Sequence, residues 1–190
     1  MQKVLLIDNY DSFVYNLKQL LDESGLCETT IVFNDKLNLK KATLFDRILI
    51  SPGPGLPIEA GSTIEIIKKL SPSHPILGIC LGCQAIVEVY GGKLFQLDKI
   101  YHGHQSELIR TNSDEPLFVN IAQRFKTGRY HSWGLDIQKN SELNITSRTE
   151  SGLAMSVRHK KYNVCGLLFH PESIMTPAGK TMIENWLRYS

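Results

Sequence analysis

The sequence predicts an α/β protein whose first half forms a parallel β-sheet covered by helices on both faces. Over residues 3–90, short apolar segments typical of buried strands alternate with segments of helical periodicity. Such alternation favours a parallel sheet between two helical layers. After residue 105, strand-like segments follow one another with almost no helix between them. Antiparallel strands, or a mixed extension of the sheet, fit that second half.

The elements of the first half follow in order along the chain. A buried strand over residues 3–8 precedes a helix that Asp11 or Ser12 can cap and that runs to about Ser24, because its apolar residues recur at helical spacing. Further strands are expected at 29–33, 46–50 and 75–79, and further helices at 64–70 and 82–90. The last of these helices begins almost directly after the strand at 75–79.

The second half contains five expected strands and one terminal helix. The strands cover residues 105–111, 125–130, 143–149, 153–158 and 164–169, and the helix covers 178–188. No internal repeat, low-complexity segment or linker interrupts the pattern. We therefore expect a single domain over residues 1–190.

Composition and charge argue against several functional classes. The chain has 190 residues, of which 42% are hydrophobic and 21% charged, and the net charge of +2 is dispersed along it. No basic run supports binding to nucleic acid. The first apolar stretch, Val4 to Ile7, is too short for a signal peptide or a membrane span, so we expect a cytoplasmic protein without membrane contact. Without a secretory signal, the four cysteines are expected to be free thiols.

The segment Gly78-Ile79-Cys80-Leu81-Gly82 follows a strand and opens a helix. This is the pattern of a nucleophile elbow, in which a tight turn presents the central side chain at the carboxyl end of the sheet. The helix N-terminus favours a thiolate, and the amide of Leu81 can donate to an oxyanion. A buried cysteine between two packing glycines gives the same pattern. So does a thiol–disulfide oxidoreductase, because Cys80 and Cys83 form a C-x-x-C at a helix start.

A cysteine nucleophile needs a base, and the best candidate is His170. It ends the apolar run from Val164 to Phe169 and is followed by Pro171 and Glu172. In an extended segment, residues two apart point to the same side, so Glu172 can hold one ring nitrogen and leave the other for the thiol. A surface histidine beside a turn is the alternative. A thiol–disulfide oxidoreductase has no use for a paired histidine and glutamate, whereas a triad enzyme needs them.

A proline-glycine loop, Ser51-Pro52-Gly53-Pro54-Gly55, follows the third expected strand. Fixed backbone amides in the segment Gly53, Pro54 and Gly55 can supply the second half of an oxyanion hole, although the loop alone indicates only a turn. It lacks the Gly-Lys-Ser/Thr ending of a phosphate-binding loop. No metal site is expected, because His102 and His104 have no evident third ligand.

Taken together, these segments resemble class I (triad) glutamine amidotransferases over essentially the whole chain. The resemblance rests on five segments: Leu6–Phe13, Ser51–Gly55, Gly78–Ile86, Tyr130–Ser132 and His170–Ser173. The proline-glycine loop and the His-Pro-Glu-Ser-Ile segment are similar to the branch that serves chorismate-using synthases. The resemblance implies a three-layer flavodoxin- or Rossmann-like fold with a mixed, mostly parallel central sheet.

The resemblance also implies a reaction and a set of roles. Cys80 would attack the side-chain amide of L-glutamine, with His170 as acid and base and Glu172 holding His170. Backbone amides of Leu81 and of the loop formed by Gly53, Pro54 and Gly55 would stabilise the oxyanion, while Gln84 and the backbone of Ser132 and Trp133 would bind the polar groups of the substrate. No cofactor is implied. The ammonia would pass to a chorismate-binding synthase subunit in a hetero-oligomer, serving anthranilate synthase or, alternatively, aminodeoxychorismate synthase. The Asp8–Phe13 loop is the expected contact surface.

Two positions depart from the family pattern. Cys83 stands where histidine is usual, and it creates the C-x-x-C that suggests a reversible disulfide with Cys80. Trp133 stands where leucine is commoner after His-Ser. The rival hypotheses are a thiol–disulfide oxidoreductase, a cysteine α/β hydrolase that acts on esters without a partner, and a non-catalytic binding subunit.

Overall fold

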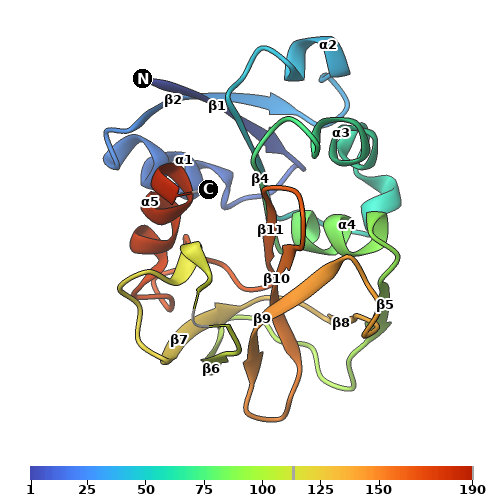
Figure 1. Ribbon diagram of the computed structural model, residues 1–190, viewed down its shortest axis with the longest axis vertical. Helices are drawn as coiled ribbons and strands as arrows, with labels where there is room; N and C mark the ends of the chain where they lie inside the picture. The colour runs from blue at the N-terminus through green and yellow to red at the C-terminus, as the bar shows by residue number, and fades with distance from the viewer. Residues whose placement is uncertain (113, 190) are drawn as a thin grey trace.

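A mixed β-sheet runs through the centre of the molecule. In the computed structural model, which describes residues 1–112 and 114–189, nine strands form this sheet in the order β2-β1-β3-β4-β11-β10-β9-β6-β7 (Figure 1). Their bounds are β1 Gln2–Asp8, β2 Cys27–Phe33, β3 Arg47–Ile50, β4 Ile76–Ile79, β6 His104–Arg110, β7 Arg124–Arg129, β9 Leu143–Thr149, β10 Ala154–His159 and β11 Val164–Leu167.

The sheet divides into a parallel half and an antiparallel half that meet at β11. Strands β2, β1, β3, β4 and β11 pair in parallel, whereas β10, β9, β6 and β7 continue from β11 in antiparallel pairing. The predicted α/β class and mixed sheet are therefore confirmed. Strand β11 lies beside β4 although six strands separate them in sequence, from β5 to β10, and Leu167 is level with Ile79. Their carboxyl ends consequently meet at one edge.

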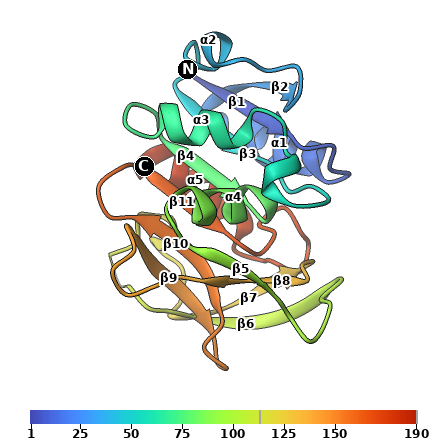
Figure 2. The same ribbon diagram turned by 90° about the vertical axis from the view of Figure 1, so that its right-hand side faces the viewer.

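Helices cover both faces of the parallel half, which explains why its central strands are apolar throughout. Helices α1 (Val14–Glu23) and α5 (Gly179–Tyr189) pack together on one face. Helices α3 (Thr63–Leu70) and α4 (Leu81–Val89) pack together on the other (Figure 2). Residues 48–50 of β3 and 76–79 of β4 are buried along their whole length, as expected for strands with no solvent-facing side.

Several short elements were not predicted from the sequence. They are α2 (Leu39–Ala42), the 3₁₀ turns η1 (Pro57–Glu59) and η2 (Pro116–Phe118), and a separate two-stranded sheet of β5 (Lys93–Gln96) and β8 (Trp133–Asp136). Strand β5 is mostly exposed, so it carries no apolar alternation that would reveal it. Its antiparallel pairing with β8 defines it instead.

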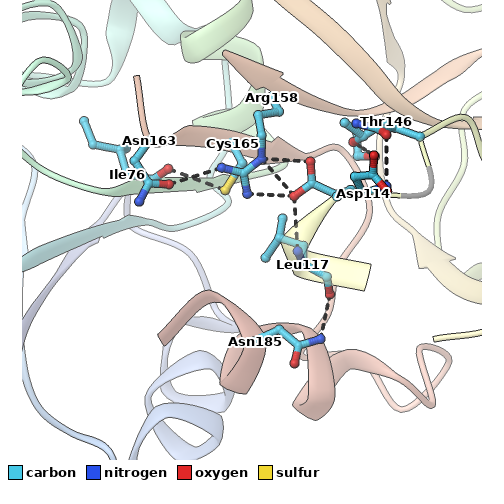
Figure 3. Close-up of polar contacts among 11 residues, drawn as sticks. Ile76, Asp114, Leu117, Thr146, Arg158, Asn163, Cys165 and Asn185 are labelled. Carbon is cyan, nitrogen blue, oxygen red and sulfur yellow. Dashed lines mark hydrogen bonds and ion pairs between the residues drawn. The ribbon is translucent and has the colours of Figure 1, made fainter. Parts of the chain in front are cut away.

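A buried ion pair ties the antiparallel half to α5 (Figure 3). The Arg158 guanidinium on β10 donates to both carboxylate oxygens of Glu115 at 2.6–2.9 Å, and the Glu115 side chain is fully buried. Glu115 also accepts from the amide of Leu117 at 3.2 Å, while Asn185 of α5 donates to the Leu117 carbonyl at 3.0 Å. Glu115 thus links η2 to β10, and Leu117 links η2 to α5.

The helices of this fold are short. Within the described part of the chain, none combines the length and apolar character needed to cross a membrane.

Candidate active site

Cys80 sits on a sharp turn between β4 and α4. Its φ of +49° and ψ of −100° lie in a region that non-glycine residues rarely adopt. The two flanking glycines make the turn sterically feasible, because a Cβ atom at Gly78 would lie 2.4 Å from the backbone of Gly82. A Cβ atom at Gly82 would in turn lie 2.7 Å from the carbonyl oxygen of Ile50. The strand–turn–helix geometry of a nucleophile elbow is therefore present.

His170 lies just beyond the end of β11, beside this elbow. The Cys80 amide donates to the carbonyl of Leu167 at 2.8 Å, so the two chain segments are joined directly. The Nδ1 atom of His170 lies 2.6 Å from Oε1 of Glu172, and both side chains are buried. The sequence argument assumed an extended segment here. Instead, residues 170–173 form a turn in which the Ser173 amide donates to the His170 carbonyl at 3.3 Å, and this turn brings the Glu172 carboxylate to Nδ1 of the ring.

One hydroxyl group fixes the backbone of His170 against β7. The Thr176 hydroxyl donates to the His170 carbonyl at 2.6 Å and accepts from the Gly128 amide at 2.9 Å. The His170 amide donates to the Gly128 carbonyl at 3.0 Å. Sequence reasoning missed Thr176, because a threonine in a loop has many uses and only the fold places it here.

The His170 ring is enclosed by aromatic side chains. The Tyr130 ring meets it edge-on at 4.9 Å between centroids, and the Phe13 ring does so at 6.2 Å. The Tyr130 hydroxyl lies 3.1 Å from the Ser173 hydroxyl, which holds the Tyr130 ring in place. These rings limit the rotation of the imidazole and exclude water from one side of it.

The electrostatic surroundings of His170 favour its protonated form. Burial by itself lowers the pKa of His170, but the proximity and negative charges of Cys80 and Glu172 outweigh burial and raise that pKa to about 10. Among the described groups, the buried Nε2 atom has no hydrogen-bond partner within ordinary geometry. Its other nitrogen is occupied by Glu172, so Nε2 is available for the sulfur or for a bound substrate.

A cavity of about 300 Å³ opens onto Cys80. Every substrate-binding residue predicted from the sequence, except Leu81, lines this cavity. Its lining residues are Gly53, Pro54, Gly55, Leu56, Cys80, Gln84, Tyr130, His131, Ser132 and Trp133. Leu81 begins α4 directly beside the nucleophile, and its side chain lies against Gly53, where a Cβ atom would come within 2.9 Å of it.

The proline-glycine loop is braced by Asn9, a residue that sequence reasoning did not single out. The Asn9 amide donates to the Ser51 hydroxyl, and its side chain donates to the Ser51 carbonyl, both at 2.9 Å. Gly53 packs so closely that a Cβ atom there would lie 2.6 Å from the Asn9 side chain. The loop is thus held at a fixed distance from the elbow.

The second cysteine of the C-x-x-C lies away from this cavity. Cys83 is fully buried, and its sulfur packs against β11, where a Cβ atom at Gly166 would lie 2.7 Å from it. Burial raises the pKa of the Cys83 thiol well above its ordinary value. This position fits a packing role and disfavours the exchange chemistry of an oxidoreductase.

His102 and His104 are too few to form a metal site by themselves. Across residues 1–112 and 114–189, no group of three or more histidine, cysteine, aspartate or glutamate side chains is arranged to hold a metal ion.

Comparison with known proteins identifies the family of this chain. The family model for class-I glutamine amidotransferases matches residues 5–189. The chain belongs to this family. The amidotransferase is 44% identical over 190 residues to anthranilate synthase component 2 of Cyanophora paradoxa, an alignment that covers 97% of each chain. It is 41% identical over 194 residues to the chloroplastic anthranilate synthase beta subunit 2 of Arabidopsis thaliana, covering 97% of this chain and 70% of the relative.

Solved structures share the fold of the amidotransferase at lower sequence identity. A Thermoplasma acidophilum structure described as a subunit of GMP synthase superposes with a TM-score of 0.87 at 23% identity. The superposition covers 98% of this chain and 92% of that one. The fold is therefore retained where most of the sequence has diverged.

Proposed function

We propose that this chain, as one amidotransferase domain over residues 1–190, hydrolyses L-glutamine and passes the ammonia to a chorismate-using synthase subunit. The observation that carries the proposal is a strained Cys80, joined by its backbone amide to the end of β11, beside a buried His170 that Glu172 orients through a 2.6 Å contact. A nucleophile, a base and an orienting group in this arrangement define a covalent acyl-transfer mechanism.

In the first half-reaction, Cys80 gives its thiol proton to Nε2 of His170, and the resulting thiolate attacks the side-chain carbonyl carbon of glutamine. The carbonyl π electrons move to oxygen, and the backbone amides of Leu81 and the Gly53–Gly55 loop are the proposed donors to that oxyanion. When the tetrahedral intermediate collapses, the carbon–nitrogen bond breaks. His170 transfers its Nε2 proton to the departing nitrogen, so ammonia leaves and a γ-glutamyl thioester remains on Cys80.

In the second half-reaction, water hydrolyses the thioester. His170, now neutral, accepts a proton from the attacking water while the new carbon–oxygen bond forms. The carbon–sulfur bond then breaks, releasing glutamate and regenerating the thiolate. Glu172 stabilises the imidazolium each time it forms and keeps the proton of the neutral ring on Nδ1.

Ammonia has to be shielded after its release, because neutral water protonates it and removes its nucleophilicity. The loop after β1 and the turn after β11 flank His170, and both expose apolar side chains: Tyr10 is 56% exposed and Ile174 is 96% exposed. Large exposed apolar groups beside an active site fit a docking surface. We assign this face to the synthase subunit, since docking there would cover the point of ammonia release.

The names of the relatives favour one of two synthases. The two relatives described above carry the name of anthranilate synthase, and each aligns over 97% of this chain. Anthranilate synthase is therefore the preferred partner, and aminodeoxychorismate synthase is the second candidate.

The decisive experiment uses the complex with the co-purified synthase subunit. Cys80→Ser should abolish glutamine-dependent product formation and leave the reaction with free ammonium salts intact. Loss of both activities would indicate a structural role for Cys80 and contradict the proposal. Mass spectrometry of the product distinguishes anthranilate from aminodeoxychorismate.

A further inference from the structure

Arg129, at the end of β7, is a buried cation with neutral partners. Only 3% of the residue is exposed, and its guanidinium carbon lies 3.5 Å from the centroid of the Tyr101 ring. Its Nε atom donates to His131, and Nη1 lies 3.4 Å from the Ser106 hydroxyl. None of the ion pairs formed within the described residues involves Arg129. A buried charge without a counter-ion is costly to maintain, so a fold that keeps one has a use for it.

Arg129 fixes the tautomer of His131. A guanidinium can only donate, so the 3.1 Å contact from Arg129 Nε requires a lone pair on His131 Nε2. The ring proton must then lie on Nδ1, which donates to the Trp133 carbonyl at 2.9 Å. Burial and the adjacent Arg129 charge lower the pKa of His131 to about 3, although the Trp133 carbonyl opposes them. His131 therefore stays neutral throughout the working pH range.

The same segment is held at two more carbonyl groups. The Tyr101 amide donates to the His131 carbonyl at 3.1 Å, and the Leu97 amide donates to the Ser132 carbonyl at 2.8 Å. With the His131 ring on Trp133, three consecutive carbonyls are fixed by hydrogen bonds. Ser132 and Trp133 line the cavity over Cys80, so these bonds set the position of one wall of the substrate site.

We infer that Arg129 and His131 are positioning residues that lock the Ser132–Trp133 backbone into the shape that binds glutamine. The inference rests on the proposed glutaminase function and adds to it a chain of contacts that runs from Arg129, which is not part of the cavity lining, through His131 to the substrate wall. Neither residue exchanges a proton with the substrate. Disturbing them displaces the bound glutamine relative to Cys80 while leaving the nucleophile and its base in place.

The inference is tested with variants that remove one or both of the hydrogen bonds formed by the His131 ring. His131→Ala removes both bonds, whereas His131→Asn keeps an amide nitrogen near the Nδ1 position and preserves the contact with Trp133. Arg129→Met removes the charge and the donor. Arg124→Met is the matched control, because Arg124 lies on the same strand but is half-exposed and pairs with Glu107 at the surface.

In the complex with the synthase subunit, Arg129→Met and His131→Ala should raise the KM for glutamine about ten- to a hundredfold, with a smaller change in kcat. His131→Asn should restore most of the KM, and Arg124→Met should match the wild type. An unchanged KM in both Arg129→Met and His131→Ala would overturn the inference. Equal losses in His131→Asn and His131→Ala would do so too.

A second measurement distinguishes positioning from loss of folding. Cys80 is labelled in parallel by diazo-oxo-norleucine, which is shaped like glutamine, and by iodoacetamide, which is not. The positioning variants should react more slowly only with the glutamine-shaped reagent, and equal slowing with both reagents would overturn the inference. A wild-type protein that reacts with iodoacetamide but not with diazo-oxo-norleucine would refute the proposed function itself.

Discussion

The Nδ1 atom of His170 lies 2.6 Å from Oε1 of Glu172 inside a turn, and both side chains are shielded from solvent. The short contact assigns the ring proton to Nδ1 whenever the imidazole is neutral, which leaves Nε2 facing the reaction. The arrangement also places a negative charge beside the imidazolium. Both effects depend on a single carboxylate.

Replacing this carboxylate by an amide should therefore impair catalysis without removing the nucleophile. Glu172→Gln is expected to reduce the glutaminase kcat by roughly 10²- to 10⁴-fold, the usual contribution of an oriented general base. Steady-state measurement of glutamate release in the complex tests this. Iodoacetamide labelling of Cys80 is the control for an intact elbow. A kcat within twofold of the wild type would remove Glu172 from the mechanism.

The pH dependence follows from the raised pKa of His170. Its value of about 10 in the folded protein lies above the ordinary value of 6.5. The stabilisation from its proton is therefore complete below pH 6.5 and is lost as the pH rises through about 10. Because departing ammonia needs the same proton, kcat/KM for glutamine should fall as the pH approaches 10. Glu172→Gln should move this fall to lower pH, and an unshifted profile would contradict the assignment.

The burial of Cys83 changes the expectation for redox control. The C-x-x-C suggested a regulatory disulfide with Cys80, but the Cys83 sulfur packs against Gly166 inside the core, which disfavours that pairing. Peroxide should consequently inactivate the wild type and Cys83→Ala at the same rate. Cys83→Ala should lower the free energy of unfolding by roughly 0.5–3 kcal/mol and retain glutaminase activity. Slower inactivation of Cys83→Ala than of the wild type by peroxide would support the regulatory disulfide after all.

The ion pair in Figure 3 should contribute far more to stability than a similar pair at the surface. Glu115→Ala leaves the Arg158 charge buried without its carboxylate, which is expected to cost about 3–5 kcal/mol. Glu107→Ala breaks the half-exposed pair with Arg124 and should cost at most about 1 kcal/mol. Urea unfolding of the two variants gives the comparison. Equal destabilisation of the two variants would show that burial does not determine how much these ion pairs contribute to stability.

Local sequence patterns predicted the strands of the first half and, together with the family resemblance, the residues that we propose carry the chemistry. Apolar strands, a glycine-flanked cysteine and a histidine at the end of an apolar run are all short-range signals. They led to Cys80, His170 and Glu172, whose side chains the structure brings to one edge of the sheet. The reasoning for the last two was partly wrong, because a turn closed by Ser173 brings them together where an extended segment was assumed.

Long-range contacts could not be predicted in this way. Thr176 bridges Gly128 and His170, and Asn9 braces Ser51, but each depends on strands that lie far apart in sequence. Strand β5 and its partner β8 escaped prediction because pairing rather than periodicity defines them. The positioning roles proposed for Arg129 and His131 likewise depend on their contacts with Tyr101 and Trp133, which the sequence does not reveal.

The Cys80 amide donates a hydrogen bond to the Leu167 carbonyl, so hydrogen exchange at this amide reports on whether the candidate active site is assembled. That proton exchanges with solvent only when β4 and β11 separate, and their separation would also part the thiol from the imidazole. Slow deuterium uptake at this single amide thus signals a competent resting protein, even before any glutamine is added.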